Sequence, residues 1–213
     1  MTSQNWVSLL NPNTFASGPG PLLTLAASTQ VASPVTGVAN QDVAQVNASG
    51  QYQGWSDGLL IRVTARGFYT SSATTGTLTP LIRYNKGNST VAASQTTILA
   101  SNGITTPSAI VTGMQWYLRA LIRCTEVAVS AVNTVAGQGE FTFYILPGAP
   151  PTLPASPVLM STAPGWSVAM PNASGEQVTQ VDTTQIAGIN LSFTGTAAQG
   201  TIQCTQWAVE ALT

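Results

Sequence analysis

The chain has 213 residues, of which 44% are hydrophobic and only 6% are charged, and its formal net charge at pH 7 is -1. With six basic residues and a sequence pI near 5.1, it lacks the positive surface expected of a nucleic-acid-binding or membrane-surface protein. No apolar run approaches the roughly 18 residues of a membrane span, and we expect no targeting signal. A poorly charged surface favours association with copies or partners, so the composition indicates an assembly component.

Residues 1–21 are predicted to form an extended N-terminal arm. Prolines and glycines between residues 12 and 21 oppose regular structure there. The apolar residues Trp6, Leu9 and Leu10 cannot be buried by so short a segment alone. We therefore expect the arm to lie against the rest of the domain or against a neighbouring molecule.

Short apolar runs in residues 22–46 are interrupted by Pro34 and Gly37, which is typical of edge strands or of a bulged strand. Residues 59–70 then show the period-two alternation of a long half-buried strand. Its two faces carry Leu59, Ile61, Val63, Ala65 and Tyr69 on one side and Arg62, Thr64, Arg66 and Phe68 on the other.

A hairpin is expected next, between residues 77–84 and 89–99, because a short turn containing Asn and Gly separates two strand-like runs. The longest strand is predicted at residues 114–132, a run without Gly or Pro that is rich in β-branched and aromatic residues. It is predicted to organise the sheet. One face carries Met114, Trp116, Leu118, Ala120, Ile122, Cys124 and Ala128, and the other carries Gln115, Tyr117, Arg119, Leu121, Arg123 and Thr125.

After Gly137 and Gly139, residues 140–146 are predicted to form a strand with Phe141 and Phe143 pointing one way and Thr142 and Tyr144 the other. The C-terminal part is predicted to form a hairpin of residues 188–195 and 201–212. The N- and C-terminal strands are both apolar and could lie side by side in one sheet.

Residues 147–171 hold seven prolines, which excludes a central strand. We expect a polyproline-like strap there, with Trp166 and Met170 packing beneath it. Elsewhere the short strands, the Gly-rich turns and the lack of any long helical pattern predict an all-β fold. We expect an antiparallel two-sheet sandwich of jelly-roll type, formed by residues 22–213 as a single domain.

Catalysis is not expected. The chain has no histidine, which removes the commonest general base and zinc ligand. Its seven carboxylates are scattered; a pair such as Glu126 and Glu210 could still meet in space, but single solvated or cross-strand carboxylates are the commoner arrangement. Cys124 and Cys204 fit packed reduced thiols, with a disulfide as the alternative. No P-loop, nucleophile elbow or Cys-x-x-Cys occurs, so we expect no enzyme activity, cofactor or metal.

Arginines are the more informative charges. Five of the six basic residues lie in predicted strands, and a spacing of four keeps two pairs of them on single strand faces. They are Arg62, Arg66, Arg83, Arg119 and Arg123. Such a row fits either a solvated outer face or an interface with a partner, and the sequence leaves both open.

The strands GLLIRVTARGFY and WYLRALIRCTEVAV, followed by INLSFTGTAAQGTIQCTQWAVEAL, resemble the jelly-roll structural proteins of tailed bacteriophages, particularly head decoration (cement) proteins. The resemblance covers about residues 55–146 and 186–213. It implies a virion structural protein on the capsid surface, made in the host cytoplasm. Its expected partners are the major capsid protein and its own copies, commonly as a homotrimer, with neither nucleic acid nor membrane.

Residues of interest for such an interface are Trp6, Leu9, Leu10, Arg62, Arg66, Arg119, Arg123 and Trp166. The alternative is a carbohydrate- or receptor-binding module of a phage tail fibre or spike, in which aromatic side chains would stack on sugar rings. The candidates for that role are Tyr52, Trp55, Trp116 and Trp166. The two functions differ in exposure, because a binding module should place two or more of these aromatics together on a solvent-facing groove.

Overall fold

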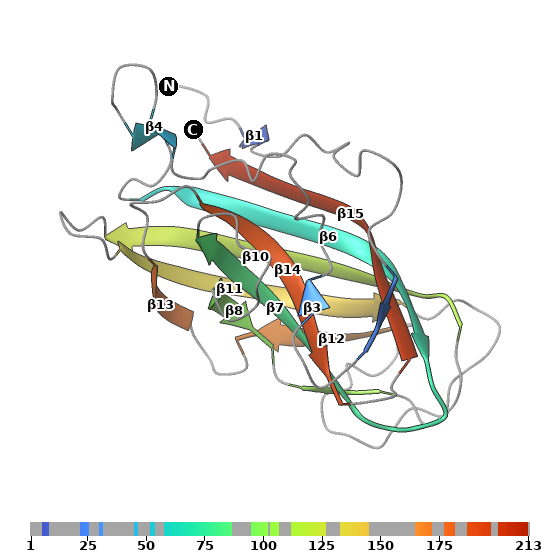
Figure 1. The fold of residues 1–213 in the computed structure, drawn as a ribbon. Helices are drawn as coiled ribbons and strands as arrows, with labels where there is room; N and C mark the ends of the chain where they lie inside the picture. The colour runs from blue at the N-terminus through green and yellow to red at the C-terminus, as the bar shows by residue number, and fades with distance from the viewer. Residues whose placement is uncertain are drawn as a thin grey trace.

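The computed structural model describes fourteen segments of the chain, and they contain strands, turns and no helix. The segments are residues 6–8, 22–25, 30–31, 45–46, 52–53, 58–86, 95–101, 103–106, 112–126, 133–144, 165–171, 177–181, 187–196 and 200–212. Two antiparallel sheets face each other (Figure 1), so the predicted all-β two-sheet sandwich is confirmed.

The large sheet has a main path of six antiparallel strands. In order, these are β1 (Trp6–Ser8), β15 (Gly200–Leu212), β6 (Leu60–Ser71), β10 (Met114–Glu126), β11 (Asn133–Tyr144) and β12 (Gly165–Met170). Two further strands join it off this path: β13 (Gln177–Val181) pairs with β11, and β2 (Leu23–Thr24) pairs with β15.

The small sheet runs in the order β3 (Gln30–Val31), β14 (Ala187–Gly195), β7 (Thr77–Lys86) and β8 (Gln95–Ala100), with β9 (Ile104–Thr105) pairing with β7. A separate pair consists of β4 (Gln45–Val46) and β5 (Tyr52–Gln53). The β7–β8 pairing confirms the predicted hairpin, although residues 87–94 between these strands lie outside the described part of the chain.

The predicted alternation in β6 and β10 is confirmed. In β10 the even positions from Met114 to Cys124 are buried, while the odd positions are exposed or part-buried. In β6 the odd positions from Ile61 to Tyr69 are buried. Strand β10 pairs with β6 on one side and β11 on the other, as its predicted organising role requires.

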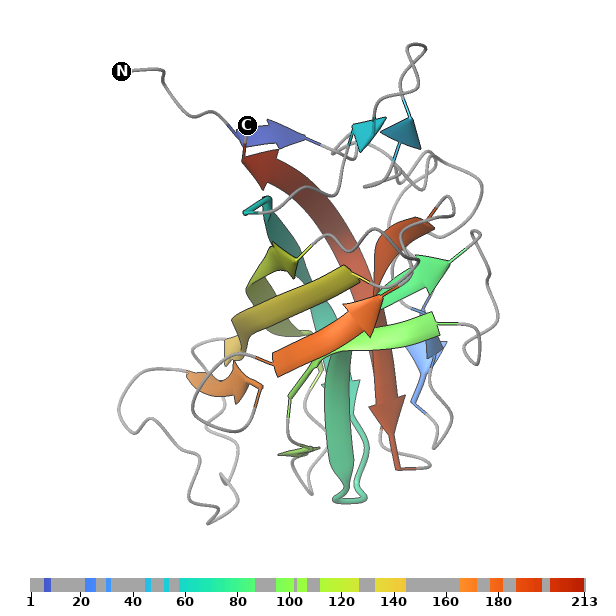
Figure 2. The same cartoon turned by 90° about the vertical axis from the view of Figure 1, so that its left-hand side faces the viewer.

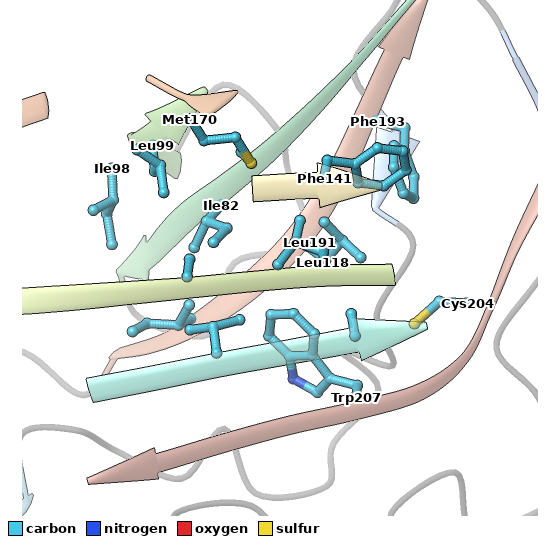
Figure 3. Close-up of a cluster of buried hydrophobic side chains, with 14 of the residues drawn as sticks. Ile82, Ile98, Leu99, Leu118, Phe141, Met170, Leu191, Phe193, Cys204 and Trp207 are labelled. Atoms are coloured by element: carbon cyan, nitrogen blue, oxygen red, sulfur yellow. The ribbon is translucent and has the colours of Figure 1, made fainter. Parts of the chain in front are cut away.

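Aromatic rings from both sheets meet in the core. Trp116 of β10 stacks on Phe141 of β11, with centroids 5.4 Å apart, and Phe193 of β14 packs edge-on against Trp116 at the same distance. Figure 3 shows Leu118 and Phe141 of the large sheet and Leu191 and Phe193 of the small sheet in this cluster. Burial of these faces against each other holds the sandwich together.

The predicted C-terminal hairpin is wrong. Strand β14 pairs with β7 and β3 in the small sheet, whereas β15 pairs with β6 and β1 in the large sheet. The physical reason is that each strand has an apolar face, and the two strands bury these faces from opposite sides of one core. Side-by-side placement of the terminal strands is confirmed, because Trp6–Ser8 pairs with Glu210–Leu212 (Figure 2).

Strand β11 starts earlier than predicted and contains both Gly137 and Gly139. A Cβ atom on Gly139 would lie 2.5 Å from the backbone oxygen of Arg119 and 2.7 Å from Cβ of Ala120, so close strand approach explains this glycine within a strand. Phe141 and Phe143 are both buried, so they point the same way as predicted, and this side is the core.

The predicted Pro-rich strap is corrected at its C-terminal end. Residues 165–170 form the edge strand β12, which pairs with β11, because this stretch has no proline and can complete a ladder. Met170 is buried. Residues 147–164 lie outside the described part of the chain, as do residues 1–5 and 9–21 of the predicted arm, including Leu9 and Leu10.

Candidate functional site

The outer face of the large sheet carries four of the arginines noted in the sequence. Arg62 and Arg66 stand on β6, and Arg119 and Arg123 stand on the adjacent β10. Arg66, Arg119 and Arg123 are exposed, and Arg62 is part-buried. We call the surface that bears them the arginine face. Period-two alternation places them there, because the intervening residues of both strands point into the core.

Among the side chains that the structure describes on it, the arginine face carries more guanidinium groups than carboxylates. Nε of Arg62 lies 2.8 Å from Oε2 of Glu210 on β15, and this hydrogen bond raises the pKa of Arg62. Arg119 lies opposite Glu140 of β11 in the strand register. The outward side chains that the structure describes on β15, β6, β10 and β11 thus include four guanidinium groups and two carboxylates.

A shallow hollow of about 360 Å³ opens on the arginine face between β6 and β10. It is lined by Arg66, Gly67, Phe68, Gln115, Trp116 and Tyr117. The register pairs Arg66 with Tyr117 and Phe68 with Gln115, so these four outward side chains surround the hollow as two adjacent cross-strand pairs. Phe68 is 45% exposed, which is unusual for a large apolar side chain in the described part of this protein.

Of the four aromatic residues considered for sugar stacking, the structure describes the side chain of Trp116. Trp116 is 1% exposed and its indole Nε1 donates a hydrogen bond to the backbone oxygen of Phe68, so its assignment as a surface platform is wrong. Trp116 occupies an even position of β10, as Leu118 does, and the even positions of this strand point into the core. Trp55 lies outside the described residues, and only the backbone is described for Tyr52 and Trp166.

Two other aromatics line the outer hollow, Phe68, which is exposed, and Tyr117, which is part-buried. Both were placed on the outward face by the sequence pattern, but neither was singled out for binding. The signal that could have found Phe68 is an aromatic residue at an outward position of an alternating strand. Which residues lie next to Phe68 on the adjacent strands depends on the pairing register. The alternation of apolar and polar residues within one strand does not determine that register.

The remaining interface candidates lie far apart in strand order. Trp6 is in β1 opposite Leu212, at one edge of the large sheet. Trp166 is in β12 opposite Phe143, at the other end of the strand order. The fold therefore gathers the four arginines on one face and leaves these two tryptophans on opposite edge strands.

Arg83 has a different environment from the other strand arginines. It lies on β7 of the small sheet, is 8% exposed, and its NH2 group donates a hydrogen bond to the backbone oxygen of Gln95 at 2.7 Å. Burial lowers the pKa of Arg83. A solvated outer face is therefore wrong for this residue, because its sheet face is covered: Asn190 and Ser192 on the neighbouring β14 are also buried.

Glu126 and Glu210, the carboxylate pair suggested by the sequence, lie neither on the same strand nor on adjacent strands. Glu210 is held by Arg62, and β6 separates its strand from β10, where Glu126 lies. Within the described segments, no group of three or more His, Cys, Asp or Glu residues could hold a metal ion.

Both cysteines are buried free thiols, which confirms the reduced alternative over a disulfide. Burial raises the pKa of Cys204 to about 12, and its Sγ lies 3.1 Å from the backbone oxygen of Gln206, to which it donates. A thiol with such a pKa is a poor nucleophile near neutral pH, because the thiolate is the reactive form.

We find no helix in the described chain that is long and apolar enough to cross a membrane. No family model matches the sequence, and no curated protein matches it.

Proposed function

We propose that this chain is a virion structural protein that assembles with its own copies on a capsid, as its resemblance to head decoration proteins implies. The observation that carries the proposal is the position of β1. This strand lies at the edge of the large sheet and, among the described strands, pairs with β15 alone. Residues 6–8 thus lie at the rim of the large sheet.

An edge strand offers unpaired N–H and C=O groups on its outer side, and proteins usually protect such edges with charged residues or proline. The sequence of β1, Trp6-Val7-Ser8, contains neither. The segment is therefore suited to pairing with, or packing under, another chain. Burial of Trp6 together with Leu9 and Leu10 would contribute on the order of a few kcal/mol per arm.

The low charge of the whole chain supports the same proposal. Six basic and seven acidic residues in 213 leave broad neutral surface, which favours association. If each arm binds the next copy in a head-to-tail manner, the contacts close into a ring, and the resemblance implies three copies. The shell beneath, built of the major capsid protein, is the second partner.

The test compares three proteins with the intact chain: a deletion of residues 1–21, the edge variant Val7→Lys, and the control Thr24→Lys. Thr24 is exposed on β2, which also pairs with β15, so the control adds the same charge away from β1. Light scattering measures the solution mass, and co-sedimentation measures occupancy on capsids of the virus that encodes the chain.

We expect the deletion and Val7→Lys to lower both mass and occupancy, and Thr24→Lys to change neither. If the deletion leaves mass and occupancy unchanged, the role of the arm is refuted. If the intact protein is a monomer without affinity for the capsid, the decoration function itself is refuted.

A further inference from the structure

The exposed Phe68 lines the hollow on the arginine face. The described chain exposes three large hydrophobic side chains, Leu22, Phe68 and Val178, and Phe68 is the aromatic one among them. It stands on the long strand β6, which pairs along its length with β10 and β15 and so forms a firm support. A flat apolar ring held on a rigid sheet is a typical contact surface for a ligand.

Polar groups of three kinds surround this ring. Arg66 and Gln115 are both exposed and carry no hydrogen bond from their side chains within the described part of the chain. Tyr117, which carries a hydroxyl group, lines the same hollow. Gln115 can donate and accept hydrogen bonds, and Arg66 presents the planar fork that binds a carboxylate through two N–H groups.

The charge of the face restricts the ligand further. Arg62 is already bound to Glu210, so Arg66 is the cation that the hollow offers to a ligand. The described side chains of the same face include four arginines and two glutamates, and this balance favours an anion over a neutral molecule. The volume of about 360 Å³ falls within the range of small-molecule sites.

We infer that the hollow lined by Arg66, Phe68, Gln115 and Tyr117 binds an acidic saccharide, that is, a sugar ring that bears a carboxylate. The apolar face of the sugar packs on Phe68 and Tyr117. Its carboxylate binds Arg66, and its hydroxyl groups exchange hydrogen bonds with Gln115. This assignment goes beyond the proposed assembly function and does not depend on it.

The probe is trigalacturonic acid, compared with the neutral galactose trisaccharide of the same linkage. Binding to the full chain is followed by NMR titration, because a shallow site of this size gives modest affinity. We expect the acidic trisaccharide to bind and the neutral one to bind at least about tenfold more weakly, since one lost charge-assisted contact corresponds to that factor.

Two variants test the residues. Phe68→Ala should weaken binding of the acidic probe about tenfold, and Arg66→Gln should weaken it similarly and remove the preference for the acid over the neutral sugar. The matched controls are Val178→Ala, which removes exposed apolar surface outside the hollow, and Arg119→Gln, which removes a charge from the same face. Val178→Ala should bind as the wild type does, and Arg119→Gln should weaken binding clearly less than Arg66→Gln does. All four changes are at exposed positions, and thermal unfolding verifies that each variant is folded.

Three results would overturn the inference. The first is no binding of trigalacturonic acid at millimolar concentration. The second is binding that Phe68→Ala and Arg66→Gln leave unchanged, or that Arg119→Gln weakens as much as Arg66→Gln does. The third is binding of a poly-glutamate peptide through Arg66 and Phe68 without binding of the saccharide, which would assign the hollow to a protein partner instead.

Discussion

Gly67 of β6 and Trp116 of β10 are cross-strand partners, and the indole of Trp116 occupies the space that a side chain at position 67 would need. A Cβ atom on Gly67 would lie 2.7 Å from Cζ2 of Trp116 and 1.8 Å from the backbone oxygen of Gln203. The indole Nε1 also donates a hydrogen bond of 3.2 Å to the backbone oxygen of Phe68. The largest fully buried side chain that the structure describes is thus accommodated by a glycine on the neighbouring strand, and both residues line the outer hollow.

Replacing Gly67 with alanine should therefore destabilise the fold by about 3 kcal/mol, because the added methyl group meets backbone as well as the indole. Urea unfolding followed by tryptophan fluorescence measures the change. The matched control is Gly137→Ala in β11, where the nearest atoms to a new Cβ lie 3.6 Å away on Leu99, an ordinary packing distance. This control should cost less than about 1 kcal/mol. Equal stability of the two variants would contradict the close approach at Gly67.

Phe141 should be among the most costly core positions to truncate. Its ring lies 5.4 Å from that of Trp116, 5.0 Å from that of Phe143 and 6.0 Å from that of Phe193. Phe141→Ala should cost about 3–5 kcal/mol in the free energy of unfolding. A double-mutant cycle with Phe193→Ala should give a coupling of about 0.5–1.5 kcal/mol across the two sheets. A coupling of zero would show that the two rings do not pack against each other.

Arg83 should contribute more to stability than the arginines of the arginine face. Arg83→Met retains much of the side-chain bulk but leaves the backbone oxygen of Gln95 without this donor, in a buried place. We expect a loss of about 1–3 kcal/mol. Arg119→Met, on an exposed site, should change stability by no more than about 0.5 kcal/mol. The comparison is made by chemical unfolding, and a larger loss for Arg119→Met would reverse the assignment.

The free energy of unfolding should fall in alkaline solution, and the first group to cause this fall should be the thiol of Cys204. Burial raises its pKa from an ordinary value of 9.0 to about 12, so the unfolded chain loses the thiol proton first as pH rises. The contribution of Cys204 is fully present below pH 9.0 and declines as the pH rises towards 12. Burial likewise raises the pKa of Tyr69 from 10.0 to about 12, which adds a decline above pH 10.0.

The measurement is the free energy of unfolding against pH for the wild type and for Cys204→Ala. Below pH 9.0 the two curves should run parallel, and between pH 9.0 and 10.0 the variant should decline less steeply. A thiol reagent at pH 8 should also react slowly with the native protein and rapidly with the unfolded one, because both cysteines are buried. Rapid modification of the native protein would contradict this burial.

The sequence by itself determined the local structure of the longest strands. Alternation in β6 and β10 predicted which residues face the core and placed the four arginines of the arginine face on outward positions. This is possible because a strand has a side-chain period of two, which each segment carries within its own residues. The all-β class followed from the same local signal, repeated along the chain.

Only the tertiary structure decided which strands become neighbours. Strands β14 and β15 are adjacent in sequence and have the pattern of a hairpin, yet they lie in different sheets because each buries its apolar face against the other sheet. Arg83 and Arg119 occupy similar strand positions in the sequence, yet one is buried and the other exposed, because only one of the two outer faces is covered at that point.

The hollow on the arginine face is likewise a feature that only the tertiary structure decided. Its lining requires Arg66 to stand opposite Tyr117 and Phe68 to stand opposite Gln115, residues about fifty positions apart in the chain. A shift of one residue in the β6–β10 register would separate these pairs without altering the alternation of either strand. Register is set by how the buried faces interlock, as Gly67 does with Trp116, and that interlocking exists only once the two strands are packed together.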